Sequence, residues 1–426
     1  MSKIIIFSFS PIYEDNQWQL LSFYEGFSEA FTKRGHVVTH IITNECNIDP
    51  WNGNNIPFSN KLAIDTINKI KKFNPDLIIS FNNSIINNIG KYVDCPIVIA
   101  EADQWMYFSN KPEIKKNVNR YHFFYFTKFG AKNFIENFGA NNKQIFHIPL
   151  ATNITNKSLI KKNNINFIGS LYDINYVQNK LEYNNAKYRL NILDRLKKFD
   201  PIIYTNYTPP SYISLKDYII TKQVWKKNDV EKIFNQSLIS LNISHLQARN
   251  TAFSWRLLDI MGSNSLLITE TNNFLTKSLY KISSKQLYES PRDCFNKIKY
   301  FLKNKSAMND LIFRQNEYVN RYARWNDRIK KIEEIFNLKV NNNLNINKLS
   351  YHRDIKKIRI NKKIKFDNYI LLIVYLFASI KTLFTSIKTL FGSIKTLSTI
   401  GLRKKLKKNT ALGILIKKIY LASQSK

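Results

Sequence analysis

The strongest constraint on the fold is a regular alternation of short apolar runs with amphipathic segments. The series begins with KIIIFSF from Lys3 and continues with apolar residues at spacings of four, three and four: Leu20, Tyr24, Phe27 and Phe31. Buried runs that alternate with helix-period segments are typical of parallel sheets covered by helices on both faces. The sequence therefore predicts an α/β protein.

The alternation forms two successive series. In the first, the expected strands are residues 3–9, 36–43, 76–81, 96–100, 121–127 and 145–151, and the expected helices are 20–34, 61–73, 84–92 and 131–138. In the second, the expected strands are 165–170, 201–205, 237–243 and 265–270, with helices around residues 190–196, at 230–235, at 253–262 and onward to about 336. We expect two doubly wound, Rossmann-like domains that face each other across a cleft.

Polar stretches mark the expected domain boundaries. The segment ATNITNKSLIKKNN at 151–164 is polar and basic, and NNNLNIN at 341–347 is an Asn-rich run without periodicity, as expected for linkers. We therefore place an N-terminal domain at 1–155, a second domain at 156–340 and a tail at 341–426. The 426 residues are enough for two cores, and 14% aromatic content can fill them.

Charge is concentrated in the tail. The chain has a net charge of +34, and residues 341–426 contribute 19 Lys or Arg against two Asp, a net of +17. An exact seven-residue repeat, SIKTLFT, SIKTLFG and SIKTLST from Ser379, places Ile, Leu and Phe on one helical face and lysines on another. This pattern predicts a basic amphipathic helical tail that lies on an anionic membrane.

Other interpretations of the tail stay open. It could form a coiled coil or dock on the chain's own body, although charges of opposite sign at the flanking heptad positions are missing. It could also contact nucleic acid, although a long aliphatic face does nothing for phosphate binding. The apolar run at 369–378 covers about 15 Å as a helix, too short to cross a hydrocarbon core of about 30 Å.

The three cysteines exclude a disulfide framework and a zinc site of the usual spacing. Cys46, Cys95 and Cys294 are far apart and form no CxxC pair, so we expect reduced, cytosolic thiols. The apolar run from Lys3 is too short for a signal peptide and ends at Pro11. His36 and His40 share one face of an expected strand, but without a third ligand they are expected to be structural.

Ligands of doubly wound sheets bind beyond the carboxyl ends of the strands, which selects the candidate site residues. These residues follow expected strands or begin the next helix: Asp15, Asp103, Gly169, Ser170, His245, Arg249, Arg256 and Glu270. No GxGxxG follows a strand and no GxxxxGK[ST] occurs, which argues against classical dinucleotide enzymes and P-loop NTPases. A helix N-terminus near Phe253, with Arg249 and Arg256, could instead hold a diphosphate.

The chain resembles bacterial glycosyltransferases of the two-Rossmann GT-B fold, particularly spore-maturation-type enzymes. The resemblance covers residues 3–337, and it is carried by these segments: KRGHVVTHI from Lys33, NPDLIISFN from Asn74, FGANNKQIFHIPLATN from Phe138, NINFIGSLYD from Asn164, SLISLNISH from Ser237 and SWRLLDIMGSNSLLITE from Ser254. It implies an N-terminal acceptor domain, a second domain that binds a nucleotide sugar as substrate, and neither cofactor nor metal.

The resemblance also implies roles for single residues. Asp259 matches the acidic residue that accepts from the donor ribose hydroxyls, and Arg256 would face the donor phosphates. Family members often have Glu in place of Asp259, and retaining relatives have another Glu where this chain has Thr251. The two-glutamate pattern is therefore incomplete, and the stereochemistry stays open.

Glycosyl transfer needs a neutralised diphosphate and a base for the acceptor hydroxyl. We rank Asp103 first and Asp15 second as the base, with a turn residue and a helix cap as their structural alternatives. His245 and Glu270 are expected at the donor, with a hydrogen-bonded structural histidine and a helix N-cap region as the alternatives.

The leading hypothesis is a cytoplasmic glycosyltransferase, peripheral on the inner face of the cell membrane. It would move a sugar from a nucleotide sugar to a cell-surface glycan or a lipid-linked acceptor, as in polysaccharide biosynthesis, without binding a specific nucleic acid. Two alternatives stay open: a GT-B-like sugar-nucleotide epimerase, which needs no acceptor, and a non-enzymatic nucleic-acid-binding protein that would explain the charge.

Overall fold

The structure is a computed structural model in which the chain divides into compact units at Met1–Ile346 and Asn347–Lys426. It describes residues 1–10, 13–14, 17–43, 60–82, 84–101, 112–126, 130–175, 180–222, 224–244, 254–271 and 283–340, all within the first unit. The predicted amphipathic tail lies outside the described residues. Within the described ranges, no helix is both long enough and apolar enough to cross a bilayer.

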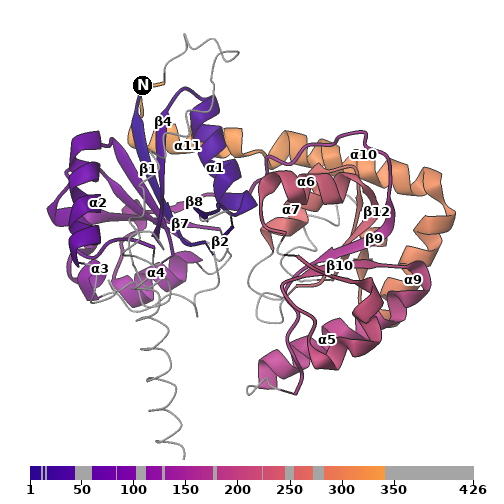
Figure 1. The fold of residues 1–426 in the computed structure, drawn as a ribbon. Helices are drawn as coiled ribbons and strands as arrows, with labels where there is room; N and C mark the ends of the chain where they lie inside the picture. Colours follow the sequence, from indigo (N-terminus) through magenta and orange to yellow (C-terminus); the bar gives the residue numbers. More distant parts are fainter. Residues whose placement is uncertain are drawn as a thin grey trace, which may run out of the picture. The chain divides into compact units, whose positions relative to one another are not determined.

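The first half of the chain forms a parallel six-stranded sheet in the order β4-β1-β5-β6-β7-β8 (Figure 1). Its strands are β1 (Lys3–Ser8), β4 (Val37–Ile42), β5 (Leu77–Phe81), β6 (Ile97–Ala100), β7 (Tyr121–Tyr125) and β8 (Ile145–His147). Its helices are α1 (Ser22–Lys33), α2 (Asn60–Phe73), α3 (Pro112–Lys116) and α4 (Gly130–Phe138). Strands β2 (Tyr13–Glu14) and β3 (Gln17–Trp18) pair as an antiparallel hairpin.

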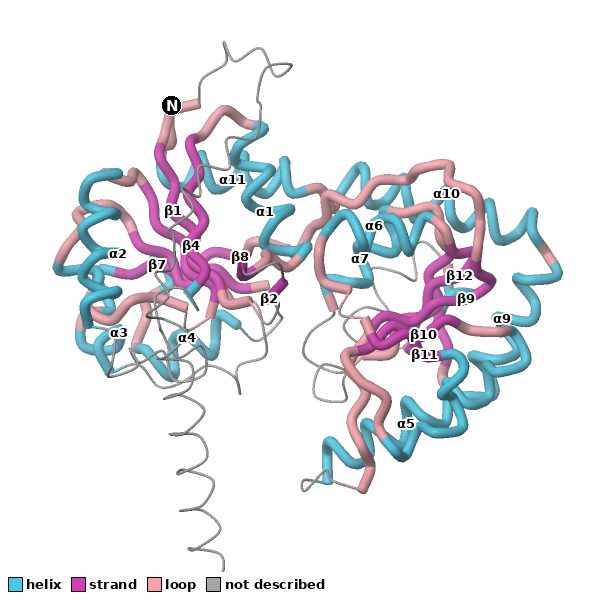
Figure 2. Tube along the Cα trace, viewed as in Figure 1, coloured by secondary structure: helices cyan, strands magenta, loops and turns pink. Residues whose placement is uncertain are grey.

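The second half forms another parallel six-stranded sheet, in the order β11-β10-β9-β12-β13-β14 (Figure 2). Its strands are β9 (Asn163–Ile168), β10 (Ile202–Thr205), β11 (Ile219–Thr221), β12 (Ser237–Asn242), β13 (Leu266–Glu270) and β14 (Leu287–Tyr288). The helices are α5 (Lys180–Arg195), α6 (Lys227–Asn235), α7 (Trp255–Gly262), α9 (Pro291–Lys303), α10 (Lys305–Tyr322) and α11 (Trp325–Phe336). The predicted architecture of two Rossmann-like halves is confirmed.

Side-chain alternation along the strands sends residues to both faces of each sheet. In the first half, Ile5 and Phe7 of β1 pack with α2 and α4, whereas Ile4 and Ile6 pack with α1. In the second half, α5 and α9 cover one face and α6 and α7 cover the other (Figure 1). Burial on both faces explains why the strands are nearly continuous apolar runs.

The prediction of a helix at residues 84–92 is wrong. The structure has only a single 3-10 turn there, η3 (Ile89–Lys91), and Asn88 before it adopts the left-handed conformation with φ of 60°. Asparagine tolerates this conformation and a continuing helix does not, so the Asn87–Asn88 pair ends the helical pattern. Strands β11 and β14 and the β2–β3 hairpin were not predicted from the sequence, because two or three residues are too short for a periodic signal.

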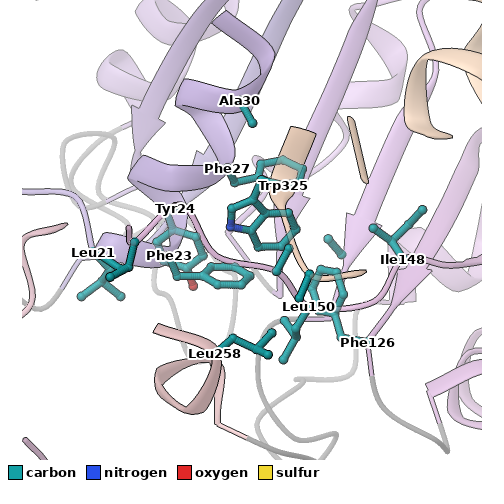
Figure 3. Packing of buried hydrophobic residues seen from close by; sticks show 14 of the residues in the cluster. Leu21, Phe23, Tyr24, Phe27, Ala30, Phe126, Ile148, Leu150, Leu258 and Trp325 are labelled. Carbon is teal, nitrogen blue, oxygen red and sulfur yellow. The ribbon is translucent and has the colours of Figure 1, made fainter. Parts of the chain in front are cut away.

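One hydrophobic cluster runs through both halves of the chain. Phe23 on α1 packs edge-on against Trp255 of α7, with ring centroids 4.8 Å apart, and against Trp325 at the start of α11, at 5.2 Å. Figure 3 shows Phe23, Trp325 and Leu258 of α7 in this cluster. Phe23, Leu258 and Trp325 are almost fully buried and Trp255 is partly buried, so the two sheets share one core where α1 meets α7.

The last described helix, α11, returns to the first sheet although it follows the second in sequence. Glu333 of α11 accepts two hydrogen bonds of 2.6 Å from Arg34 and one of 2.8 Å from His36. Burial raises the pKa of Glu333, but these donors outweigh it and hold the pKa below the ordinary value. The Glu333 carboxylate therefore fastens α11 to the residues between α1 and β4.

Substituting Glu333→Gln should reduce the free energy of unfolding by about 2 kcal/mol at pH 7, because Arg34 and His36 would lose a partly buried anionic partner. The matched control is Glu334→Gln, an exposed glutamate on the same helix, which should change it by less than about 0.5 kcal/mol. Urea unfolding of both variants measures the difference. Equal stability of the two variants would show that the Glu333 contacts do not fasten α11.

Candidate functional site

The order of the second sheet creates a topological switch point between β9 and β12. From β9 the chain proceeds outward through β10 and β11, and then crosses to β12 on the other side of β9. In open α/β sheets, ligands bind outside the carboxyl ends of the strands at this point. We name the region after these two strands, formed by Gly169, Ser170, Ile243 and Ser244, the switch-point crevice.

Arg256 lies on the β9 side of this region, next to Gly169 and Ser170. It occupies the first turn of α7, where Ser254 is the N-cap and accepts from the Arg256 backbone N–H at 3.3 Å. Its Nη1 donates to the carbonyl of Ile168, the last residue of β9, at 2.7 Å. The guanidinium lies over the Trp225 ring, 5.9 Å from the centroid. Arg256 thus places a cation where β9 ends.

Arg256 also lines a small hollow beside the end of β9. The other residues of this hollow come from the ends of β9 and β10 and from the segment before α6: Ile168, Gly169, Ser170, Tyr204, Thr205, Asn206, Lys222, Val224 and Trp225. The predicted residues Gly169, Ser170 and Arg256 are therefore brought together. Lys222 adds a second cation to this hollow. Its exposed ammonium group pairs with the Asp229 carboxylate, with Nζ and Oδ2 3.4 Å apart.

Arg189 is a site residue that the sequence reasoning missed. Its side chain is buried beneath the crevice, where Nη1 donates to Ser170 O at 2.5 Å and Nη2 to Ile243 O at 3.1 Å. The sequence did hold a signal, because Arg189 follows Ala186 by three residues and precedes Leu193 by four. An arginine at this spacing lies on the same face of the helix as the apolar residues, and that face packs against the sheet.

The two guanidinium groups influence each other electrostatically. Burial lowers the pKa of Arg256 to about 10; the Asp259 carboxylate opposes this effect, and the positive charge of Arg189 adds to it. Burial also lowers the pKa of Arg189. A bound anion would relieve this repulsion, so the crevice suits a negatively charged ligand.

Asp259 lies one helical turn from Arg256 but faces the first half of the chain. Its carboxylate accepts from Thr152 Oγ1 at 2.5 Å and from Ser22 Oγ at 3.3 Å. A second small hollow joins Asp259 to Ser22, Trp225, Trp255 and Arg256. The carboxylate therefore links the start of α1 and the connecting segment to α7, and its role at the donor ribose stays a prediction.

Glu270 ends β13 and is buried. Its Oε1 accepts from the backbone N–H of Ser244 at 2.7 Å, which places the carboxylate at the end of β12 beneath the crevice. The prediction that Glu270 contacts the donor stays a prediction.

Four predicted site residues lie outside the described residues: Asp15, Asp103, His245 and Arg249. The two histidines expected to be structural are hydrogen-bonded within the first half. His40 contacts the hydroxyls of Ser8 and Ser28, each at 2.7 Å, and its burial lowers its pKa to about 3. His36 contacts Glu333, as described above.

Two further points about the described residues bear on the site, metal ligands and a hollow at the other end of the second sheet. The described residues contain no group of three His, Cys, Asp or Glu side chains that could hold a metal ion. Another hollow, lined by residues such as Lys161, Asp200 and Asp217, lies where β9 and β10 begin, at the opposite edge of the sheet from the switch point. The rule for open α/β sheets argues against the substrate site there.

The buried position of Asp259 predicts a pH-dependent stability. Burial raises its pKa to about 6, although Thr152, Arg256, Ser22 and Lys227 oppose the shift. The folded state therefore holds the proton more tightly than the unfolded state, and this residue's contribution to stability falls as the pH rises from about 4 to about 6. Below pH 4 the carboxyl is protonated in both states.

Asp259→Asn removes this titration. The free energy of unfolding of the variant, relative to that of the unchanged protein, should rise by about 2 kcal/mol between pH 4 and pH 7. Urea titrations at several pH values measure this difference, with the exposed Asp310→Asn as the control. A difference that does not change with pH would contradict the raised pKa.

A family model matches the second half of the chain. Residues 189–334 match the family model described as "Glycosyl transferase-like", which begins at Arg189 and includes Arg256, Asp259 and Glu270. No curated protein sequence matches the chain.

Three solved structures share the fold over about four fifths of this chain. A glycosyltransferase from Rickettsia africae is 13% identical with a TM-score of 0.51, covering 82% of this chain and 99% of its own. Phage T4 BGT, solved with UDP and Mn²⁺, is 11% identical with a TM-score of 0.50, covering 79% and 100%. WaaG, a glycosyltransferase involved in lipopolysaccharide biosynthesis, is 10% identical with a TM-score of 0.50, covering 78% and 99%. At these identities the likeness establishes the fold, and with the family match it identifies this chain as a glycosyltransferase of the GT-B fold.

Proposed function

We propose that this glycosyltransferase holds the diphosphate of a nucleotide sugar in the switch-point crevice and transfers the sugar to a glycan or a lipid-linked acceptor. The observation that carries the proposal is the position of Arg256, whose partly buried side chain donates a hydrogen bond to the last residue of β9 beside Gly169 and Ser170. The complex of phage T4 BGT with UDP supports a nucleotide as the ligand of this fold.

The chemistry of glycosyl transfer explains why the crevice needs positive charge. When the bond from the anomeric carbon to the leaving diphosphate breaks, negative charge builds up on the phosphate oxygens. Arg256 can donate forked hydrogen bonds to these oxygens, while Arg189 adds positive charge from beneath. The N-terminus of α7, eight residues long and capped by Ser254, carries a further partial positive charge.

The acceptor half of the reaction needs a base that takes the proton of the attacking hydroxyl. Asp103 and Asp15 are our candidates, in that order, and both follow strands of the first sheet, β6 and β1. Both strands end at the carboxyl edge of that sheet, where ligands of α/β domains bind. The acceptor would therefore approach from the first domain.

We further propose that the basic tail holds the enzyme on the inner face of a bacterial cell membrane, where it would contribute to a cell-surface polysaccharide. Net charge of +17 and a repeating apolar face suit an anionic interface, since each basic residue near such a surface contributes about 1 kcal/mol. A lipid-linked acceptor would be present at the same surface. The glycosyltransferase WaaG, of the same fold, acts in lipopolysaccharide biosynthesis.

Binding of UDP, GDP, ADP and CDP to the full chain tests the donor site. Isothermal titration should detect one of them, and Arg256→Lys should weaken that binding at least 10-fold, because a single ammonium cannot reproduce the forked donors. The control is Arg314→Lys on α10, an exposed arginine paired with Asp310, which should bind as the unchanged protein does. Equal weakening in both variants, or no binding of any of the four, would remove the proposed donor site.

Deletion of residues 340–426 tests the membrane proposal. The shortened chain should keep its nucleotide affinity but no longer sediment with vesicles of phosphatidylglycerol and phosphatidylcholine, because it loses the basic amphipathic segment. The full chain should sediment with these vesicles and dissociate as salt is raised. Unchanged vesicle binding by the shortened chain would contradict the tail's role.

A further inference from the structure

Arg189 is buried more completely than a guanidinium group normally is. Its side chain is 7% exposed and lies on the inward stripe of α5, with the Phe167 ring 5.9 Å from its guanidinium carbon. Desolvation of such a charge is costly, so a buried arginine is usually kept in place by specific contacts. The contacts of Arg189 therefore indicate what the residue does.

Two hydrogen bonds of Arg189 join the strands that flank the switch point. One reaches Ser170 O after β9, at 2.5 Å, and the other reaches Ile243 O after β12, at 3.1 Å. Neither acceptor belongs to α5, and each lies just beyond the last residue of a neighbouring strand. The rigid fork of the guanidinium thus ties together the two backbone segments that form the crevice.

Glu270 completes this arrangement from the other side of the same peptide group. The carbonyl oxygen of Ile243 and the N–H of Ser244 belong to one peptide unit, and Glu270 Oε1 accepts from that N–H at 2.7 Å. A cation therefore holds the oxygen end of this peptide and an anion holds its nitrogen end. The negative charge of Glu270 also acts on Arg189, opposing the effect of burial on the Arg189 pKa.

We propose that Arg189 and Glu270 are a pair of positioning residues that fix the peptide between Ile243 and Ser244, together with the backbone at Ser170, in the orientation that the donor diphosphate requires. Neither residue needs to touch the donor. This inference rests on the donor site proposed above and adds the groups that hold its walls in place.

The first test measures the tie itself, without any ligand. Amide hydrogen exchange of the full chain should become at least 10-fold faster in peptides covering residues 163–175 and 237–244 when Arg189→Met removes the forked donors. Peptides of the first sheet, such as residues 77–81, should keep their exchange rates. The control is Arg195→Met on the same helix, an exposed arginine that donates to Asn191 Oδ1 within α5, which should leave all these peptides unchanged. Unchanged exchange in 163–175 and 237–244 would overturn the inference.

The second test asks whether the tie serves the diphosphate. Titrations compare UDP, GDP, ADP or CDP, whichever the unchanged protein binds, with the corresponding nucleoside. Arg189→Met and Glu270→Gln should each weaken the nucleoside diphosphate at least 10-fold and the nucleoside less than 3-fold, and Arg189→Lys should give an intermediate loss.

The outcomes separate this inference from the proposed function. Equal losses for the nucleoside and the nucleoside diphosphate would show a general structural role and overturn the positioning of the diphosphate. If the unchanged protein bound none of the four diphosphates, the donor site itself would fall and the positioning role with it. The exchange experiment would then still decide whether Arg189 joins β9 to β12.

Discussion

The proposed donor site depends on one interaction, the hydrogen bond from the partly buried Arg256 side chain to the carbonyl at the end of β9. That bond fixes a cation at the point where the strand order of the second sheet changes direction, and a parallel sheet offers its ligand site at that place. Arg189 lies close enough to lower the Arg256 pKa further. Asp259 and Glu270 oppose the pKa shifts of Arg256 and Arg189, and a bound anion beside Arg256 would act in the same direction.

The fold keeps this site in a defined relation to the first domain. Aromatic rings of α1, α7 and α11 pack in one core, and Asp259 accepts hydrogen bonds from Thr152 and Ser22. The N–H of Ser22 also donates to Trp225 O at 2.7 Å, next to the ring over which Arg256 lies. The side chains that join the domains are therefore direct neighbours of the donor site, so changes at one should be felt at the other.

Much of the fold could be predicted from the sequence because buried parallel strands are continuous apolar runs and their helices repeat every 3.6 residues. The predicted helix at residues 84–92 is wrong because Asn88 adopts the left-handed conformation there. Strands β11 and β14 were not predicted because they are too short to give a periodic signal. It could not foresee that α11 returns to the first sheet, because an amphipathic pattern shows that a face is buried but not against which partner. The Arg34 and His36 contacts to Glu333 are long-range and leave no local pattern.

The candidate site was predictable to a similar degree. The rule for strand ends selected Gly169, Ser170 and Arg256, which do meet at one hollow. It missed Arg189 because that residue lies in the middle of a helix, and it did not foresee that Asp259 faces Thr152 and Ser22, since hydroxyl partners distant in sequence give no spacing signal.

The most direct test of the central claim is a crystal structure of the chain with the nucleoside diphosphate that it binds. The account predicts phosphate oxygens within hydrogen-bond distance of the Arg256 guanidinium, beside Gly169 and Ser170. Density for the nucleotide where β9 and β10 begin, near Lys161 and Asp217, or on the first sheet alone, would contradict it.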